Sequence, residues 1–272
     1  MRPPSKPERR LLVDNVNKTL YIPLYGKAFV SRKGILLQDK MAEKIWEAEG
    51  VPLKGKAKSK WLAYNMGMRS AVFDAWTKQQ MAQLPEAVVL HAGCGMDSRC
   101  LRVGAENRQW FDVDFPEVIQ ERKRYFPETE TYHMIASDIR EEDWLNRVPE
   151  GKPAIVVMEG VSMYLQLPEL KAVLQSWKKR FPEVRILLDS YTVVAAKATK
   201  FKNPINEVGV TQVYGFDDPR ELEKDTGLVF VREHSLTPEN LIRQLPEKEQ
   251  GFFKTMFAGR MAKKIYRLYE YQ

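Results

Sequence analysis

The stretch that decides the fold is Val88-Val89-Leu90-His91-Ala92-Gly93-Cys94-Gly95-Met96-Asp97-Ser98-Arg99. It begins with an apolar run typical of a buried parallel strand, turns through Gly-x-Gly, and continues as a helix. A strand, a glycine turn and a helix start form the nucleotide-binding corner of an open α/β sheet. Glycine has no Cβ and tolerates positive φ, so the backbone here can approach a ligand closely. Tight turns without a ligand carry the same pattern, and the turn alone is a weak signal.

A second apolar run, at 110–116, carries the acid that strengthens this interpretation. Asp114 lies 19 residues after Gly95, a spacing typical of an acid that binds ribose hydroxyls. A dinucleotide fingerprint needs a third glycine beside the pyrophosphate, and Ser98 stands in that position. A ligand with adenosine but no phosphates does not need that glycine. The two signals together therefore predict S-adenosylmethionine as the cofactor.

From residue 87 onward, strand-like and helix-like stretches alternate, which is the pattern of a parallel sheet. The carboxyl ends of parallel strands share one edge, where ligands bind, and several of these strands end in acids. Two late strands without a long helix between them are expected to pair antiparallel at the sheet edge. We expect strands at 87–92, 109–114, 131–137, 153–159, 185–191, 228–235 and 264–271, and helices at 97–105, 116–126, 141–147, 168–180, 219–225 and 252–263.

The chain is expected to divide into an N-terminal helical segment or cap, 1–84, and a domain at 85–272 that holds the sheet. Apolar spacing predicts a helix from Asp39 to Glu49 with Asp39 as its cap, and a long helical stretch from Ser59 to Leu84. Gly67 is expected to kink or divide the latter. Residues 1–10 are expected to be disordered, 11–37 to form a packed loop or short helices, 54–60 a loop, and 193–215 a possible lid.

Composition indicates an ordinary globular protein, with 272 residues, 44% hydrophobic and 29% charged. No apolar run approaches the roughly 20 residues of a membrane helix, and the first residues lack an apolar signal core. We therefore expect a cytoplasmic protein without a membrane partner. Cys94 and Cys100 are expected to be free thiols, and no metal site is expected because no Cys/His cluster is present.

The net charge of +7 is concentrated in residues 1–80, which hold 16 Lys/Arg against 7 Asp/Glu. A solvated, lysine-rich surface explains this excess, as does a field that draws an anionic substrate or partner. No recognised RNA-binding motif accompanies it, so a nucleic-acid partner is not expected. The oligomeric state stays open.

Four motifs occur in order over roughly residues 60–192, and as a set they resemble the leucine carboxyl methyltransferase family, in its bacterial polyketide-type (tetracenomycin-like) O-methyltransferase branch. The resemblance implies an α/β class I S-adenosylmethionine-dependent methyltransferase fold. This chain has His91-Ala92 where the family more often has Leu-Gly, and its C-terminal half is short. The motifs are Ala92-Gly93-Cys94-Gly95-Met96-Asp97, Phe111-Asp112-Val113-Asp114-Phe115-Pro116, Ser137-Asp138-Ile139 and Glu159-Gly160-Val161-Ser162-Met163-Tyr164-Leu165.

The resemblance also implies roles for single residues around the methionine part of the cofactor. Arg69 matches the arginine that holds the methionine carboxylate, and Glu159 lies near the methionine amino group. Tyr164 lies near the transferred methyl group, so Tyr164 and Arg69 are the catalytic candidates. Lys18 is matched, loosely, to an N-terminal lysine of the family.

The remaining implied roles concern the adenosine part. Gly93 and Gly95 pass beneath the methionine and ribose, and Asp114 binds the ribose hydroxyls. Asp138 and Ile139 bracket the adenine, with the acid accepting a hydrogen bond from its amino group.

The resemblance, together with these residues, implies an O-methyltransferase that acts on a carboxylate of a small acidic, polyketide-like molecule. A carboxylate is already ionised at neutral pH and needs no general base, whereas a hydroxyl does. His91 lies near the cleft, but no convincing His/Asp dyad is evident in the sequence. The alternatives are methylation of a protein C-terminal carboxylate or of a phenol or alcohol hydroxyl. From other classes, an NAD-binding oxidoreductase and a non-catalytic cofactor-binding module stay open.

Overall fold

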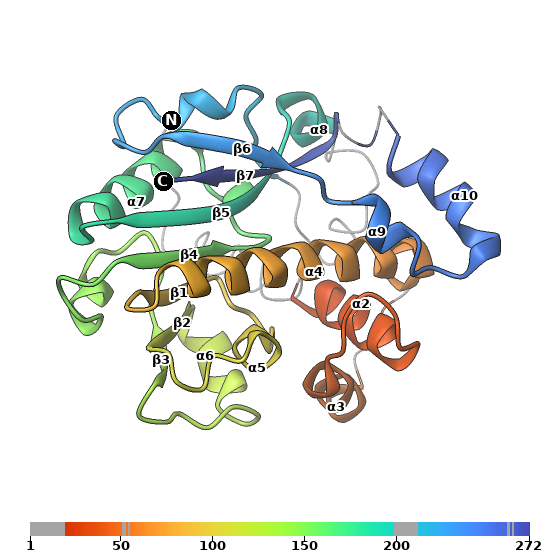
Figure 1. Ribbon diagram of the computed structural model, residues 1–272, viewed down its shortest axis with the longest axis horizontal. Coiled ribbons are helices and arrows are strands. Elements are labelled where there is room, and N and C mark those ends of the chain that lie inside the picture. Colours follow the sequence, from red (N-terminus) through yellow and green to blue (C-terminus); the bar gives the residue numbers. More distant parts are fainter. Residues whose placement is uncertain (1–19, 51–52, 54, 199–211, 260–261, 263) are drawn as a thin grey trace.

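The computed structural model describes residues 20–50, 53, 55–198, 212–259, 262 and 264–272. Its centre is a seven-stranded sheet in the order β3-β2-β1-β4-β5-β7-β6 (Figure 1). The strands β1 to β5 run parallel, while β7 pairs antiparallel with both β5 and β6. The predicted α/β class with antiparallel last strands is confirmed. The strands are β1 Val88–Ala92, β2 Trp110–Asp114, β3 Tyr132–Ala136, β4 Ala154–Met158, β5 Val184–Tyr191, β6 Phe230–His234 and β7 Tyr266–Tyr271.

The central strands β1 and β4 are buried on both faces, which is why their residues are almost all apolar. Alternate residues of β1 point to opposite faces: Val88 and Leu90 pack in the cluster that contains Trp177 of α7 (Leu167–Arg180). Val89 packs on the other face with Phe73 and Trp76 of α4 (Lys60–Gln83). In Figure 1, α4 runs across the sheet as one long helix.

The N-terminal helices lie beside the first half of α4. Residues 21–32 form a regular helix, α2 (Tyr21–Arg32), where a packed loop or short helices were expected. The helix α3 (Lys40–Glu49) begins as predicted, with Asp39 accepting a hydrogen bond from the Ala42 N–H at 2.8 Å. The predicted loop at 54–60 contains the 3-10 helix η1 (Gly55–Lys58).

Gly67 does not divide α4, which is continuous from Lys60 to Gln83 with Ser59 as its cap. A Cβ at position 67 would lie 2.9 Å from Val30 Cγ2, so the glycine allows α2 and α4 to approach closely. Since α4 contacts both α2 and the sheet, it joins the N-terminal segment to the rest of the protein. The domain boundary between residues 84 and 85 stays a prediction.

Several predicted helices are shorter in the structure. The helix α5 (Arg99–Val103) ends because Gly104 adopts a left-handed conformation, with φ of 71°. The stretches 141–147 and 219–225 contain only 3-10 helices, and the predicted helix at 252–263 begins earlier, at Glu247. The other helices and 3-10 helices are α6 Pro116–Arg122, η2 Asp143–Arg147, η3 Ser162–Tyr164, α8 Val193–Ala198, η5 Pro219–Glu221, α9 Glu239–Ile242 and α10 Glu247–Phe257.

The predicted lid at 193–215 begins with α8, but its middle, 199–211, lies outside the described residues, as do residues 1–19. Within the described part of the chain, none of the helices is long and apolar enough to cross a membrane.

Candidate active site

One cavity of about 1140 Å³ lies at the carboxyl ends of the parallel strands. Cavities that hold one drug-sized ligand measure about 300–1,000 Å³, so this one has room for a cofactor together with an acceptor. The structure brings all but one of the predicted site residues to its wall, and the exception, Lys18, lies outside the described residues. The predicted residues that line it are Arg69, Gly93, Gly95, Asp114, Asp138, Ile139, Glu159 and Tyr164.

The glycine turn needs both of its glycines. Gly93 and Gly95 have φ of 66° and 51°, in the left-handed region that favours glycine. A Cβ at Gly93 would lie 2.2 Å from Val161 Cγ2, an impossible contact. At Gly93 and Gly95 the turn therefore brings bare backbone to the cavity.

Asp114 is fixed next to this turn by two backbone hydrogen bonds. The Gly95 N–H donates to Asp114 Oδ2 at 2.7 Å, and the Phe115 N–H donates to Oδ1 at 2.8 Å. Burial raises the pKa of Asp114 to about 6. Since a carboxylate has about four acceptor sites, the oriented group retains capacity for ribose hydroxyls.

Arg69 and Glu159 form a buried ion pair across the cavity wall, with Arg69 Nε 2.9 Å from Glu159 Oε1. Arg69 Nη1 also lies 3.3 Å from Asp189 Oδ2 and donates to the Tyr266 hydroxyl at 3.1 Å. Burial opposes the ionisation of Glu159, but Arg69 and Arg99 hold its pKa at about 2. Both groups of the pair are therefore charged at neutral pH.

Sequence reasoning missed Lys27, which lies on α2 and lines the same cavity. Its side chain is almost fully buried, and Nζ lies 3.2 Å from Asp97 Oδ2. A signal was available, because Lys27 interrupts the apolar stripe that Leu20, Leu24 and Ala28 form at helical spacing. A lysine on a buried helix face needs an anionic partner or ligand.

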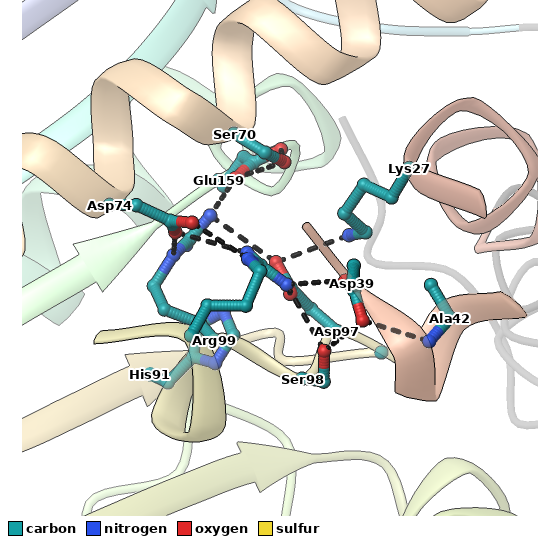
Figure 2. Close-up of polar contacts among 12 residues, drawn as sticks. Lys27, Asp39, Ala42, Ser70, Asp74, His91, Asp97, Ser98, Arg99 and Glu159 are labelled. Carbon is teal, nitrogen blue, oxygen red and sulfur yellow. Dashed lines mark hydrogen bonds and ion pairs between the residues drawn. The ribbon is translucent and has the colours of Figure 1, made fainter. Parts of the chain in front are cut away.

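A network that we call the buried charge cluster extends from the cavity wall into the protein interior (Figure 2). In it, Arg99 contacts Asp74, Asp97 and Glu159, and Arg102 contacts Asp39, Asp74 and Asp97. The cluster connects α2, α3 and α4 to the glycine turn and to the end of β4. It consists of Lys27, Asp39, Asp74, Asp97, Arg99, Arg102 and Glu159.

The cluster also explains the residue that stands in the position of the third glycine. Ser98 donates a hydrogen bond from Oγ to Asp39 Oδ1 at 2.5 Å, so its side chain serves the contact between the turn and α3. At the other end of the cavity, Asp138 is paired with Arg140, with Nη2 2.5 Å from Oδ2.

Two expectations about single residues are corrected or confirmed here. A His/Asp pair, which was not evident in the sequence, is present: His91 Nδ1 lies 3.1 Å from Asp112 Oδ1, and both side chains are buried. Asp112 is therefore part of the sheet interior and not of the ligand edge. Cys94 and Cys100 are free, as predicted, and the structure shows that both are buried.

These groups fit S-adenosylmethionine by their chemistry. The bare backbone at Gly93 and the oriented Asp114 suit a ribose, and the cavity cations Lys27 and Arg69 suit a carboxylate. The buried acid Glu159 suits an ammonium group. In the described residues, no cluster of three or more His, Cys, Asp or Glu could hold a metal ion.

The comparisons with known proteins agree with this chemistry. The family model described as leucine carboxyl methyltransferase matches residues 7–178. The tetracenomycin polyketide synthesis O-methyltransferase of Streptomyces glaucescens is 35% identical over 170 residues, which are 62% of this chain and 63% of that protein. An S-adenosyl-L-methionine-dependent methyltransferase of Gibberella zeae is 31% identical over 170 residues, 57% of each. The chain thus spans less than two thirds of the length of these curated relatives.

Among solved structures, the magnesium protoporphyrin IX methyltransferase of Synechocystis PCC 6803 superposes on this chain with a TM-score of 0.50 at 13% identity. The match covers 84% of this chain and 92% of that structure, which contains S-adenosylhomocysteine. A second structure of the same protein, with S-adenosylmethionine, gives the same score over 84% and 89%. This likeness shows the fold, which is that of the class I methyltransferases.

Proposed function

The chain belongs to the leucine carboxyl methyltransferase family, and from this premise we propose that it transfers the methyl group of S-adenosylmethionine to a carboxylate of a small acidic, polyketide-like molecule. One observation carries the proposal: eight residues chosen from the sequence line a single cavity around a left-handed glycine turn. The basic N-terminal segment supports an anionic acceptor, because positive charge raises the local concentration of anions.

In this proposal the chain's own residues position the reactants. Asp114 accepts hydrogen bonds from the ribose hydroxyls, and Asp138 and Ile139 lie on either side of the adenine. The positive charges of Arg69 and Lys27 attract the methionine carboxylate. When bound, S-adenosylmethionine supplies a methyl group on a positively charged sulfur. Positioning alone can supply about 7–11 kcal/mol of such a barrier. A carboxylate acceptor then needs orientation and loss of water, not removal of a proton.

The other half of the cavity suits the acceptor. Its wall is largely apolar and aromatic, with one side formed by residues of α4 and α10, and Tyr164 and Tyr191 also line the cavity. The α4 and α10 residues in this wall are Trp61, Leu62, Met66, Met256 and Phe257. An apolar wall favours an acceptor with a large hydrophobic body in addition to its acid group.

Cofactor choice gives the first test. S-adenosylhomocysteine at 100 times its dissociation constant should stabilise the folded protein by about 2.7 kcal/mol, and NAD should not. Thermal unfolding monitored with each ligand measures this difference. Stabilisation by NAD alone would contradict the proposal and favour an oxidoreductase.

The pH dependence of cofactor affinity should follow Asp114. Only the ionised carboxylate has its full acceptor capacity, and burial raises its pKa to about 6. The affinity for S-adenosylhomocysteine, measured by calorimetry, should therefore be full well above pH 6 and fall as the pH drops through about 6. Asp114→Asn should remove this step and weaken binding about tenfold at neutral pH. The exposed Asp225→Asn is the matched control and should behave as the wild type; a wild-type affinity that is flat across pH 6 would refute the assignment.

The chemistry of the product decides between a carboxylate and a hydroxyl acceptor. Carboxylate and phenol acceptors are incubated with labelled cofactor, and the methylated product is treated with mild alkali. A methyl ester should release its label as methanol, because esters hydrolyse and aryl ethers do not. A product that keeps its label in alkali would move the enzyme to hydroxyl methylation.

A further inference from the structure

His91 is a buried residue of the cavity wall to which neither the motifs nor the proposed mechanism assigns a role. It lies at the carboxyl end of β1, two residues before Gly93, and it lines the cavity. In the sheet register it is opposite Asp112 of β2 and Val157 of β4. It therefore lies where the carboxyl ends of β1 and β4 are side by side, with the glycine turn following β1 and Glu159 following β4.

The partners of Asp112 determine which nitrogen of His91 carries the proton. Asp112 accepts hydrogen bonds from Arg122 Nε at 2.9 Å, from Trp110 Nε1 at 2.8 Å and from the Tyr132 hydroxyl. Burial opposes its ionisation, but Arg122 and His91 hold its pKa at about 2, so the carboxylate is ionised and acts only as an acceptor. His91 Nδ1 must therefore carry the hydrogen that it shares with Asp112 Oδ1.

The same surroundings keep the ring neutral. Burial lowers the pKa of His91, although the nearby Asp112 and Asp97 favour the charged form, and the cation Arg99 opposes it. Figure 2 shows His91 next to Arg99. A neutral ring with its hydrogen on Nδ1 has a free lone pair on Nε2, to which none of the described residues donates a hydrogen bond. Nε2 of His91 is thus an uncharged hydrogen-bond acceptor on a residue that lines the cavity.

A donor in the ligand would satisfy this acceptor. Glu159, the residue matched to the cofactor's amino group, already accepts hydrogen bonds from Arg69, Ser70 and Arg99. A carboxylate has about four acceptor sites, so little of its capacity is left for an ammonium group with three hydrogens. The α-ammonium therefore needs a second acceptor on this wall.

We infer that His91 binds the cofactor directly, with Nε2 accepting a hydrogen bond from the α-ammonium group and Asp112 fixing the tautomer that makes this possible. The inference rests on the proposed function, since it assumes S-adenosylmethionine in this cavity. It assigns to His91 a binding role and no role as a base at the acceptor.

The test compares two ligands by calorimetry: S-adenosylhomocysteine, and its analogue in which hydrogen replaces the α-amino group. His91→Leu should weaken the first about 10- to 100-fold, because a hydrogen bond to a charged group is lost. It should change the affinity for the analogue by less than about twofold. His91→Gln, whose amide oxygen can reach a similar position, should recover a large part of the lost affinity.

The controls separate this role from a structural one. Asp112 keeps three donors when His91 is removed, so His91→Leu should fold, and circular dichroism checks this. His133→Leu makes the same change at a half-buried strand histidine that stacks on Phe111, on the opposite face, and should leave both affinities unchanged.

Three other results of this calorimetric comparison would contradict either the role of His91 or the proposed function. Equal loss of affinity for both ligands would show that His91 only supports the wall, for example through a water shared with Arg99 Nη1, which has no partner among the described residues. No loss for either ligand would overturn the inference. A wild-type protein that binds neither ligand would overturn the proposed function instead.

Discussion

Arg122→Leu should lower the free energy of unfolding by about 3–5 kcal/mol, the usual cost of leaving one partner of a buried ion pair without the other. Arg122 and Asp112 are both fully buried, with Nη2 2.5 Å from Oδ2. The same guanidinium donates to the Gly95 carbonyl at 2.9 Å and therefore supports the glycine turn. Chemical denaturation should show the loss of stability, and calorimetry should show weaker cofactor binding in the variant.

Arg124→Leu is the matched control for this prediction. Arg124 lies two residues further along the chain, more than half exposed, and contacts the carboxylates of Glu121 and Glu49. Exposed ion pairs contribute about 0–1 kcal/mol, so this variant should unfold almost as the wild type does. Equal effects of the two substitutions would show that the Arg122–Asp112 pair does not hold the sheet interior together.

The Arg122–Asp112 pair also predicts how the free energy of unfolding depends on pH. The folded-state pKa of Asp112 is about 2, below its ordinary value of 3.8, because Arg122 and His91 outweigh the effect of burial. Because the pKa is lowered on folding, ionised Asp112 contributes to the free energy of unfolding above about pH 4. This contribution is lost as the pH falls through about 2.

Gly93→Ala should reduce methyl transfer on the order of 100-fold, the effect expected when catalytic geometry shifts by about 1 Å. The new Cβ would lie 2.2 Å from Val161 Cγ2, so either the glycine turn or the segment that leads to Tyr164 must move. Gly93, Val161 and Tyr164 all line the cavity. Cofactor affinity and turnover with an identified acceptor measure the effect.

Gly151→Ala separates collision from backbone strain. Gly151 has a similar φ of 71°, but nothing lies within 4 Å of the position that a Cβ would take there. This control should lose about 1–2 kcal/mol of stability through the left-handed backbone and keep its activity. Adding Val161→Ala to Gly93→Ala should restore part of the methyl-transfer activity. If the double substitution restores none, and Gly93→Ala is as active as Gly151→Ala, then the contact with Val161 does not limit the activity.

The sequence alone determined the sheet, the glycine turn and eight of the residues that line the cavity. Apolar runs such as those of β1 and β4 predict strands because both faces of the sheet are buried there. The positions of Gly93, Gly95 and Asp114 follow from spacing within one strand–helix–strand unit. Such features depend on residues about 20 positions apart or less, where local chain geometry leaves few alternatives. Helix ends were less predictable, because capping and 3-10 geometry are decided by single contacts.

Only the tertiary structure decided which charges meet. Arg99 and Glu159 are 60 residues apart, and Arg102 and Asp39 are 63 apart, so no local pattern relates them. The His91–Asp112 pair depends on the register between β1 and β2, since a shift of one residue would turn one of the two side chains to the other face. Lys27 becomes a cavity residue only because α2 packs on α4, where Gly26 and Gly67 allow close approach. Long-range packing, and not sequence spacing, places these charges in a low-dielectric interior where each must find a partner.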